Sequence, residues 1–201
     1  MNAFWSNFIL TFIPLFIVLD ALGNLPVVIT LTEGTTINER RRIIHIAAGT
    51  ATIVGLIFLF FGQFILNVLS ISVGSFGVAG GIILLVLSIK YMITGHMVET
   101  AKEEMIAVVP IGTPLVVGPA TITTLLVLAN KYPLYIVLIA FLLNLLITWV
   151  IFLFSGYFVK VLGLNGLKAV SKVFSLLLAA IAVSMIIEGL NSLGILQITT
   201  G

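Results

Sequence analysis

Two apolar segments of the chain are interrupted by proline and glycine, and together they hold five of its six prolines. The first runs from Pro14 to Pro26 and the second from Pro110 to Thr121. Proline removes a backbone hydrogen-bond donor and clashes with the preceding helical turn. Irregular backbone within a bilayer is tolerated only where protein or a water-filled cavity surrounds it. Two such breaks at corresponding places in two halves of a chain therefore indicate a transporter binding site.

The composition makes the bilayer the solvent of this chain. It is 61% hydrophobic and 8% charged, with a mean hydropathy of +1.32, whereas a soluble domain has about 25% charged residues. There is no cysteine, so disulfides and thiolate chemistry are excluded, and the net charge of +2 is too small to indicate nucleic-acid binding. We expect one transmembrane domain over residues 1–201. Because the first residues carry no basic side chain, we expect the first apolar stretch to be a retained span rather than a signal peptide.

Six stretches are apolar over the roughly 20 residues that a helix needs to cross the hydrocarbon core. They are 4–31 (broken), 43–68, 73–95, 105–129 (broken), 133–160 and 168–191. Eight of the nine basic residues then flank loops on one side of the membrane: Arg40, Arg41, Arg42, Lys90, Lys102, Lys160, Lys168 and Lys172. Only Lys131 lies on the other side. The positive-inside rule predicts that both termini face outside.

The two halves of the chain resemble each other. The segment from Phe60 to Phe64 in span two matches the segment from Phe154 to Phe158 in span five, each with a central glycine. The same spacing aligns Gly95, at the end of span three, with Gly189, at the end of span six. Chance similarity between apolar helices is the alternative, but each half also has the order broken span, span, span. Because three is an odd number, the halves, about 4–95 and 105–191, are expected to form an inverted repeat.

The breaks predict an anion-binding arrangement. Pro119 suits the first position of a helix, where its missing donor costs nothing, and Gly118 before it allows close approach of a ligand. Thr121, Thr123 and Thr124 offer hydroxyl groups on the first turns, and Gly23 and Asn24 open a short helix in the first half. Helix N-termini present amide donors that suit a carboxylate. The alternative is that both breaks are kinks that serve packing.

Asp20 is the only acidic residue in the interior of a span, about 24 Å of helical rise from Phe4. A carboxylate at this depth is a functional-site hypothesis. It can pair with a substrate ammonium, carry a coupling proton or help to coordinate sodium. The structural alternative is that Asp20 caps the helix that follows the break, through the amides near Gly23.

Other polar positions are less informative. Asn144 and Thr148 share one face of span five and either line a cavity or bond between helices. Gly77 and Gly81 form a small-residue motif that predicts close helix packing. No histidine or acidic cluster has the spacing of a metal site, so no metal is expected.

The paired motifs resemble those of the MarC/SnatA family of prokaryotic membrane proteins. They are Asp20-Ala-Leu-Gly-Asn-Leu-Pro26 and Pro114-Leu-Val-Val-Gly-Pro-Ala-Thr-Ile-Thr123, and the resemblance extends over about residues 4–195. It implies a plasma-membrane protein that moves small neutral amino acids such as glycine and alanine, with a link to the proton gradient. Members of the family often have Asn-Pro where this chain has Asp20-Ala21, which leaves the coupling scheme open.

We therefore expect an all-α integral membrane protein with two inverted three-helix repeats, broken in helices one and four. The predicted function is secondary transport of small neutral amino acids by alternating access. The substrate-binding residues would be Asp20, Gly23, Asn24, Gly118, Pro119, Thr121, Thr123 and Asn144, with Asp20 also in coupling. A passive channel or an exporter of another small solute is the alternative. No enzyme activity, cofactor or nucleic-acid partner is expected; the lipid bilayer is a partner, and a homo-oligomer is compatible with the sequence.

Overall fold

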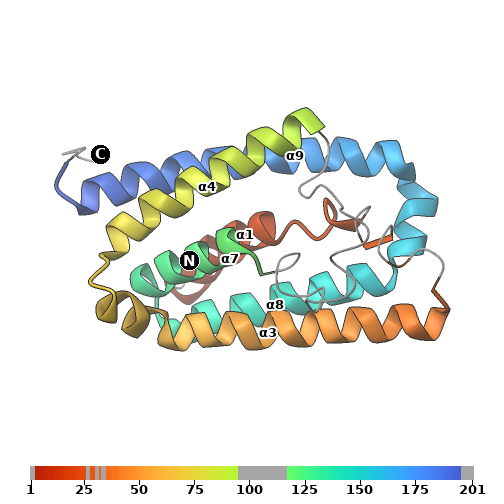
Figure 1. Ribbon diagram of the computed structural model, residues 1–201, viewed down its shortest axis with the longest axis horizontal. Coiled ribbons are helices and arrows are strands. Elements are labelled where there is room, and N and C mark those ends of the chain that lie inside the picture. Colours follow the sequence, from red (N-terminus) through yellow and green to blue (C-terminus); the bar gives the residue numbers. More distant parts are fainter. Residues whose placement is uncertain (1–2, 26–27, 30–31, 33–34, 95–116, 196–201) are drawn as a thin grey trace.

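The computed structural model describes residues 3–25, 28–29, 32, 35–94 and 117–195, and all regular structure within these ranges is helical. Figure 1 labels the helices along the chain. They are α1 (Ala3–Leu19), α3 (Ile37–Val68), α4 (Val73–Thr94), α7 (Pro119–Lys131), α8 (Leu134–Leu153) and α9 (Ser155–Ser192).

Four helical stretches are long and apolar enough to cross a membrane: Ile37–Val68, Val73–Lys90, Leu134–Leu153 and Asn165–Ser192. They correspond to the predicted spans two, three, five and six. The remaining two helices, α1 with 17 residues and α7 with 13, are each too short to cross alone. This is the pattern expected where spans one and four are broken, although residues 105–116 of span four lie outside the described residues.

The prediction of one helix over 133–160 is wrong at its C-terminal end. Helix α8 ends at Leu153, Phe154 leaves the helical conformation (φ −94°, ψ 17°) and α9 starts at Ser155. Helix α9 is itself interrupted at Gly163, with φ 66° and ψ 166°. Glycine adopts this left-handed backbone because it has no Cβ to clash. The last membrane-spanning stretch therefore begins at Asn165, slightly before the predicted boundary.

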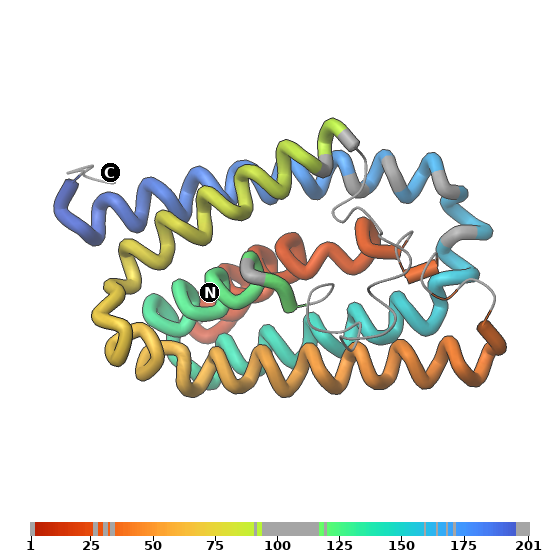
Figure 2. The backbone as a smooth tube through the Cα atoms, in the orientation of Figure 1, coloured from red at the N-terminus to blue at the C-terminus, as the bar shows by residue number. Residues whose placement is uncertain are grey.

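The two short helices lie in the middle of the bundle. In Figure 1, α3 and α8 run along one side, α4 and α9 run along the other, and α1 and α7 lie between the two pairs. The tube in Figure 2 follows the same path and places both chain ends in the left half of the view. Helices α1 and α7 contact each other, and each also contacts members of both outer pairs. The first break and the described end of the second, at the start of α7, are thus brought to the centre of the described bundle.

Helices α4 and α9 approach each other closely because glycine lies at their contacts. A Cβ built on Gly74 would lie 3.0 Å from the Gly189 carbonyl oxygen, and one on Gly81 would lie 2.7 Å from that of Ala182. Small residues allow backbones to pack at this distance. The predicted close contact is confirmed for Gly81, whereas a Cβ on Gly77 would meet its nearest neighbour at an ordinary 3.7 Å.

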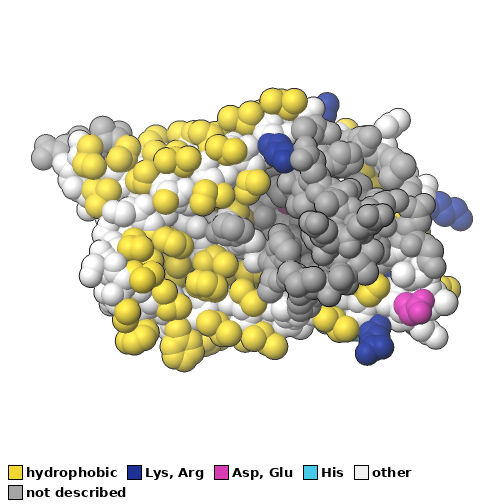
Figure 3. All heavy atoms as spheres, viewed as in Figure 1, with side chains coloured by type: hydrophobic (Ala, Val, Ile, Leu, Met, Phe, Trp, Pro, Cys, Tyr) yellow, Lys and Arg dark blue, Asp and Glu magenta, His cyan; other side chains and the backbone are white. Residues whose placement is uncertain are grey.

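In Figure 3 apolar side chains lie mainly over the left half of the face, and the lysine and arginine side chains that are visible lie in the right half. The N-terminus of α3, the C-terminus of α4 and the start of α9 lie at this end. Large side chains such as Phe60, Phe61 and Phe64 are exposed along α3. An apolar surface of this extent is expected where lipid, rather than water, surrounds the helices.

Candidate functional site

The first break lies at Asp20, not at Pro14. Helix α1 continues through Pro14 to Leu19, because the proline removes a single donor from an otherwise bonded helix. At Asp20 the backbone turns to a positive φ of 39°, which is unusual for a residue other than glycine. Strained backbone of this kind persists only where surrounding contacts hold it.

Side chains on both sides of the break satisfy its backbone groups. Asp20 Oδ1 accepts a hydrogen bond from the Gly23 amide at 3.0 Å. Asn24 Nδ2 donates to the Leu19 carbonyl oxygen, the end of α1, at 3.1 Å. The Asn24 amide donates to the Asp20 carbonyl at 3.0 Å, and the same i→i−4 pattern continues from Val28 to Asn24. A second helical segment therefore begins after Asp20, and the capping role predicted as one alternative for Asp20 is confirmed.

The second carboxylate oxygen of Asp20, Oδ2, takes no part in this cap. The residue is 1% exposed, and Oδ2 is buried without a hydrogen-bond partner among the described residues. A buried carboxylate without a partner is costly, and such groups in proteins are normally paired. Gly23 is required here because a Cβ at that position would lie 2.0 Å from this oxygen. The break thus presents a buried acceptor that capping alone does not use.

The second break ends at Gly118, the N-cap of α7, in an extended conformation (φ −84°, ψ −178°). Pro119 occupies the first turn as predicted, and the Ile122 amide donates to the Gly118 carbonyl at 3.1 Å. None of the described side chains caps this N-terminus. Pro110 and Pro114 of the same motif lie outside the described residues.

The threonines of α7 are buried and face different neighbours. Thr121, Thr123 and Thr124 are 2–3% exposed. Thr124 Oγ1 donates to the Ala120 carbonyl at 2.9 Å. Thr123 packs against α4, because a Cβ on Gly80 would lie 2.0 Å from its methyl carbon. Thr123 thus packs α7 against α4, whereas the hydrogen bond of Thr124 lies within α7 itself.

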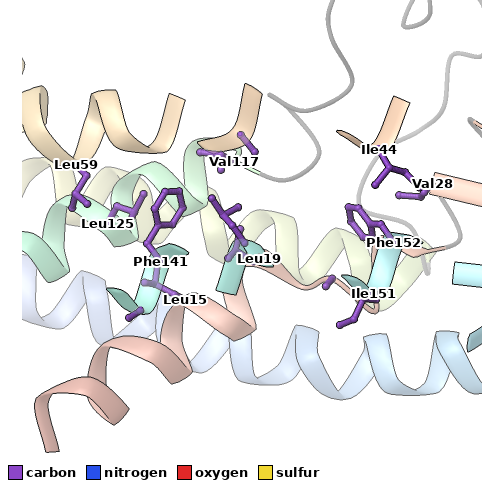
Figure 4. Close-up of a cluster of buried hydrophobic side chains, with 14 of the residues drawn as sticks. Leu15, Leu19, Val28, Ile44, Leu59, Val117, Leu125, Phe141, Ile151 and Phe152 are labelled. Carbon is purple, nitrogen blue, oxygen red and sulfur yellow. The ribbon is translucent and has the colours of Figure 1, made fainter. Parts of the chain in front are cut away.

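The described parts of the two breaks share one buried cluster. Leu19 and Ala21 flank the first break, Val117 precedes the second, and all three pack in the same core. Figure 4 shows Leu19 and Val117 within this cluster together with Phe141 of α8. Helices α1 and α7, which carry the described parts of the breaks, also contact each other directly.

Asn144 of α8 lies away from the breaks, beside the middle of α1. It is 1% exposed, and its Nδ2 donates to the carbonyl oxygens of Phe12 at 3.2 Å and Ala140 at 2.9 Å. Asn144 therefore bonds α8 to α1, as the interhelical alternative predicts. Phe12 precedes Asp20 by two turns, or about 12 Å of helix. Asn144 Oδ1 is buried without a partner among the described residues.

Two polar contacts were not anticipated from the sequence. The Arg40 guanidinium donates to Ser155 Oγ, which itself donates to the Phe152 carbonyl at 2.6 Å. This contact joins the start of α3 to the corner between α8 and α9. Lys131 Nζ at the end of α7 donates to Glu188 Oε1 of α9 at 3.0 Å. The hydrogen bond to Glu188 raises the pKa of Lys131, against the opposing effect of burial.

The Lys131–Glu188 pair lies at a cavity of about 440 Å³ between α4, α7 and α9. In the sequence, Lys131 stands out because it is the one basic residue on its predicted side of the membrane. This isolation was the available sign that Lys131 has a specific partner. Its partner is 57 positions away, so no local pattern identifies it.

The described parts of the breaks offer one buried acceptor oxygen and one helix N-terminus without a side-chain cap. Asp20 Oδ2 can accept from an ammonium group or hold a cation or proton, and the N-terminus of α7 carries a partial positive charge that favours a carboxylate. Among the described residues no three histidine, aspartate or glutamate side chains are grouped to hold a metal ion.

Comparison with known proteins gives a consistent result over nearly the whole chain. The family model described as "MarC family integral membrane protein" matches residues 5–193. A "UPF0056 membrane protein" of Buchnera aphidicola (Schizaphis graminum) is 33% identical over 193 residues, covering 93% of this chain and 97% of the relative. The "UPF0056 inner membrane protein YhgN" of Escherichia coli K12 is 34% identical over 182 residues (88% and 92%). A UPF0056 membrane protein of Methanocaldococcus jannaschii is 35% identical over 200 residues (92% and 96%). No solved structure matches.

Proposed function

The chain belongs to the MarC family of integral membrane proteins, and from this we propose that it is a secondary transporter of small neutral amino acids such as glycine and alanine. The substrate would bind between the breaks of spans one and four. The observation that carries the proposal is the shared cluster of Leu19 and Val117, which brings both breaks to the centre of the bundle beside the unused oxygen of Asp20.

The chemistry of the breaks supports an amino acid as the substrate. Its ammonium group would pair with Asp20 Oδ2, and its carboxylate would accept from amides at the start of α7. Neither broken segment contains arginine or lysine, so the carboxylate would depend on backbone donors. A small side chain is favoured because apolar residues such as Leu19, Val117 and Phe141 fill the surroundings.

The pattern of helix contacts supports the inverted repeat. If α1 is exchanged with α7, α3 with α8 and α4 with α9, most contacting pairs map onto contacting pairs, whereas α7–α8 and α8–α9 have no counterpart among the main helix contacts. The contacts α3–α8, α4–α9 and α1–α7 map onto themselves, α1–α8 maps onto α3–α7, and α4–α7 maps onto α1–α9. A positive φ also occurs in each half, at Ser70 just after α3 and at Gly163 within the first part of α9. We propose that the two repeats rock about the central site to give alternating access.

The charge distribution supports a plasma-membrane protein with both termini outside. The basic end of the bundle, which includes Arg40, Arg41 and Arg42, would face the cytoplasm. The relative YhgN is described as an inner membrane protein. Energy would come from a proton or sodium gradient, with Asp20 as the group that takes up the coupling ion.

Counterflow in proteoliposomes tests the transport proposal. Vesicles that contain the purified protein and are loaded with unlabelled glycine should accumulate external labelled glycine faster than protein-free vesicles. A passive channel would show no such trans-stimulation, and its absence for both glycine and alanine would refute the carrier. We expect Asp20→Asn to reduce counterflow at least tenfold. Glu39→Gln is the matched control, because it neutralises an exposed carboxylate and keeps the hydrogen-bonding shape of its capping box.

A further inference from the structure

The cavity beside the Lys131–Glu188 pair has no part in the central site, and its lining carries charge of both signs. It lies at the end of α7 opposite the break, about 18 Å from Pro119 along a 13-residue helix. The side chains of Lys131 and Glu188 are 52% and 48% exposed, so both reach solvent. A half-exposed ion pair of this kind is readily opened, because solvent screens it and its net contribution to stability is small.

Three helix ends meet at this cavity with complementary polarity. Val73 and Gly74 bring the N-terminus of α4, where the partial charge is positive. Lys131 ends α7 and Ser192 ends α9, and C-terminal ends carry partial negative charge. The cavity therefore holds one formal charge of each sign, together with one positive and two negative helix ends. A lone anion or cation would leave one side unpaired, whereas a zwitterion can pair with both.

The cavity is closed toward the centre of the protein. Gly77 and Val127 line it, and one turn deeper Gly80 of α4 packs directly against Thr123 of α7. On the α9 side, the sulfur of Met185 lies 4.0 Å from Thr124 Oγ1. A ligand in the cavity is thus separated from the breaks by one layer of packed side chains on α4, α7 and α9.

We propose that this cavity is a second binding site for a free zwitterionic amino acid, whose carboxylate replaces Glu188 on Lys131 and whose ammonium group replaces Lys131 on Glu188. The choice of an amino acid rests on the proposed transport function, and the site would be the vestibule from which substrate enters when α7 moves. The volume of about 440 Å³ is in the range of small-molecule sites. Its lining combines apolar surface with the polar side chains of Asn130, Lys131, Glu188, Asn191 and Ser192, so a ligand with charged groups finds partners there.

The test separates the two sites by disabling the central one. Purified full-length Asp20→Asn protein in phosphatidylcholine nanodiscs should bind about one labelled glycine per chain. Adding Lys131→Gln and Glu188→Gln together, which leaves the net charge unchanged, should lower this binding at least tenfold. Lys172→Gln is the control, since it removes an exposed lysine of α9 outside the cavity. The Tm of each variant is measured in parallel. If the ion pair serves only stability, its removal should lower the Tm without a comparable loss of glycine binding.

The outcomes distinguish this proposal from the transport proposal. If wild-type protein shows counterflow but Asp20→Asn binds no glycine, the outer site is wrong and the transporter stands. If wild-type shows no counterflow but Asp20→Asn binds glycine through Lys131 and Glu188, the outer site stands alone. Loss of glycine binding on transfer to phosphatidylethanolamine nanodiscs would overturn the proposal, because a headgroup with a primary ammonium and a phosphate would then be the occupant.

Discussion

Replacing Gly23 by alanine would drive a methyl group into the carboxylate that the first break positions. The added Cβ would lie 2.0 Å from Asp20 Oδ2, 2.5 Å from its Cγ and 2.7 Å from Oδ1. Non-bonded heavy atoms prefer about 3.5 Å or more, so the whole carboxylate must retreat by roughly 1 Å or more. Its hydrogen bond to the Gly23 amide, now 3.0 Å, would be lost.

The expected cost follows from these two effects. Loss of an N-cap hydrogen bond costs about 0.5–2 kcal/mol, and overpacking in a dense core costs about 1–3 kcal/mol. We therefore expect Gly23→Ala to destabilise the protein by about 2–4 kcal/mol. For a chain of this size, that corresponds to a fall in Tm of roughly 5–15 °C. Glycine counterflow should fall at least tenfold, because Oδ2 is displaced from its position between the breaks.

Thermal unfolding and counterflow measure the two effects on the same preparations. Gly49→Ala is the control, since a Cβ there has no neighbour within 4 Å and alanine is the better helix former. The double variant Asp20→Ala/Gly23→Ala should be no less stable than Asp20→Ala alone, because the group that the methyl strikes is absent. Additive destabilisation in the double variant, or normal stability and counterflow in Gly23→Ala, would refute the described geometry of the break.

Three further predictions concern the rest of the fold. Gly55→Ala should lower stability in thermal unfolding by about 1–3 kcal/mol, because its Cβ would lie 2.0 Å from the buried ring of Phe141. The second substitution Phe141→Leu should restore part of this stability. An unchanged Tm in Gly55→Ala would contradict the contact. Asn144→Leu should remove two hydrogen bonds and lower the free energy of unfolding by about 1–2 kcal/mol. The KM for glycine should stay within twofold of the wild-type value. A large rise in KM would place Asn144 in the substrate site. The hydrogen bonds from the Thr36 amide and hydroxyl hold the pKa of Glu39 below its usual value of 4.5. The stabilisation from this cap is therefore present above that value and lost as pH falls through the lowered pKa. Protection factors for amide exchange at the start of α3, corrected for the intrinsic pH dependence of exchange, should therefore fall in acid, but not in Glu39→Gln.

Local rules account for the features that the sequence predicted correctly. Pro119 at the first turn of α7 follows from its missing donor, and Gly118 before it follows the same preference. The long apolar stretches of α3, α4, α8 and α9 follow from length and hydropathy. The break between Asp20 and Pro26 was predicted from the same kind of local signal, although Pro14 inside α1 does not interrupt the helix. Asp20, with its positive φ and its bond to Gly23, ends α1 instead.

The sequence by itself determined that this chain lies in a bilayer and that its first span is interrupted after Leu19, because hydropathy and local backbone signals act within a few residues. Only the tertiary structure decided which atoms face one another. The meeting of Leu19 with Val117, the bond from Arg40 to Ser155 and the pairing of Lys131 with Glu188 join positions far apart in the chain. Such contacts depend on how helices pack in three dimensions, and no periodicity along a single segment encodes the partner that packing supplies.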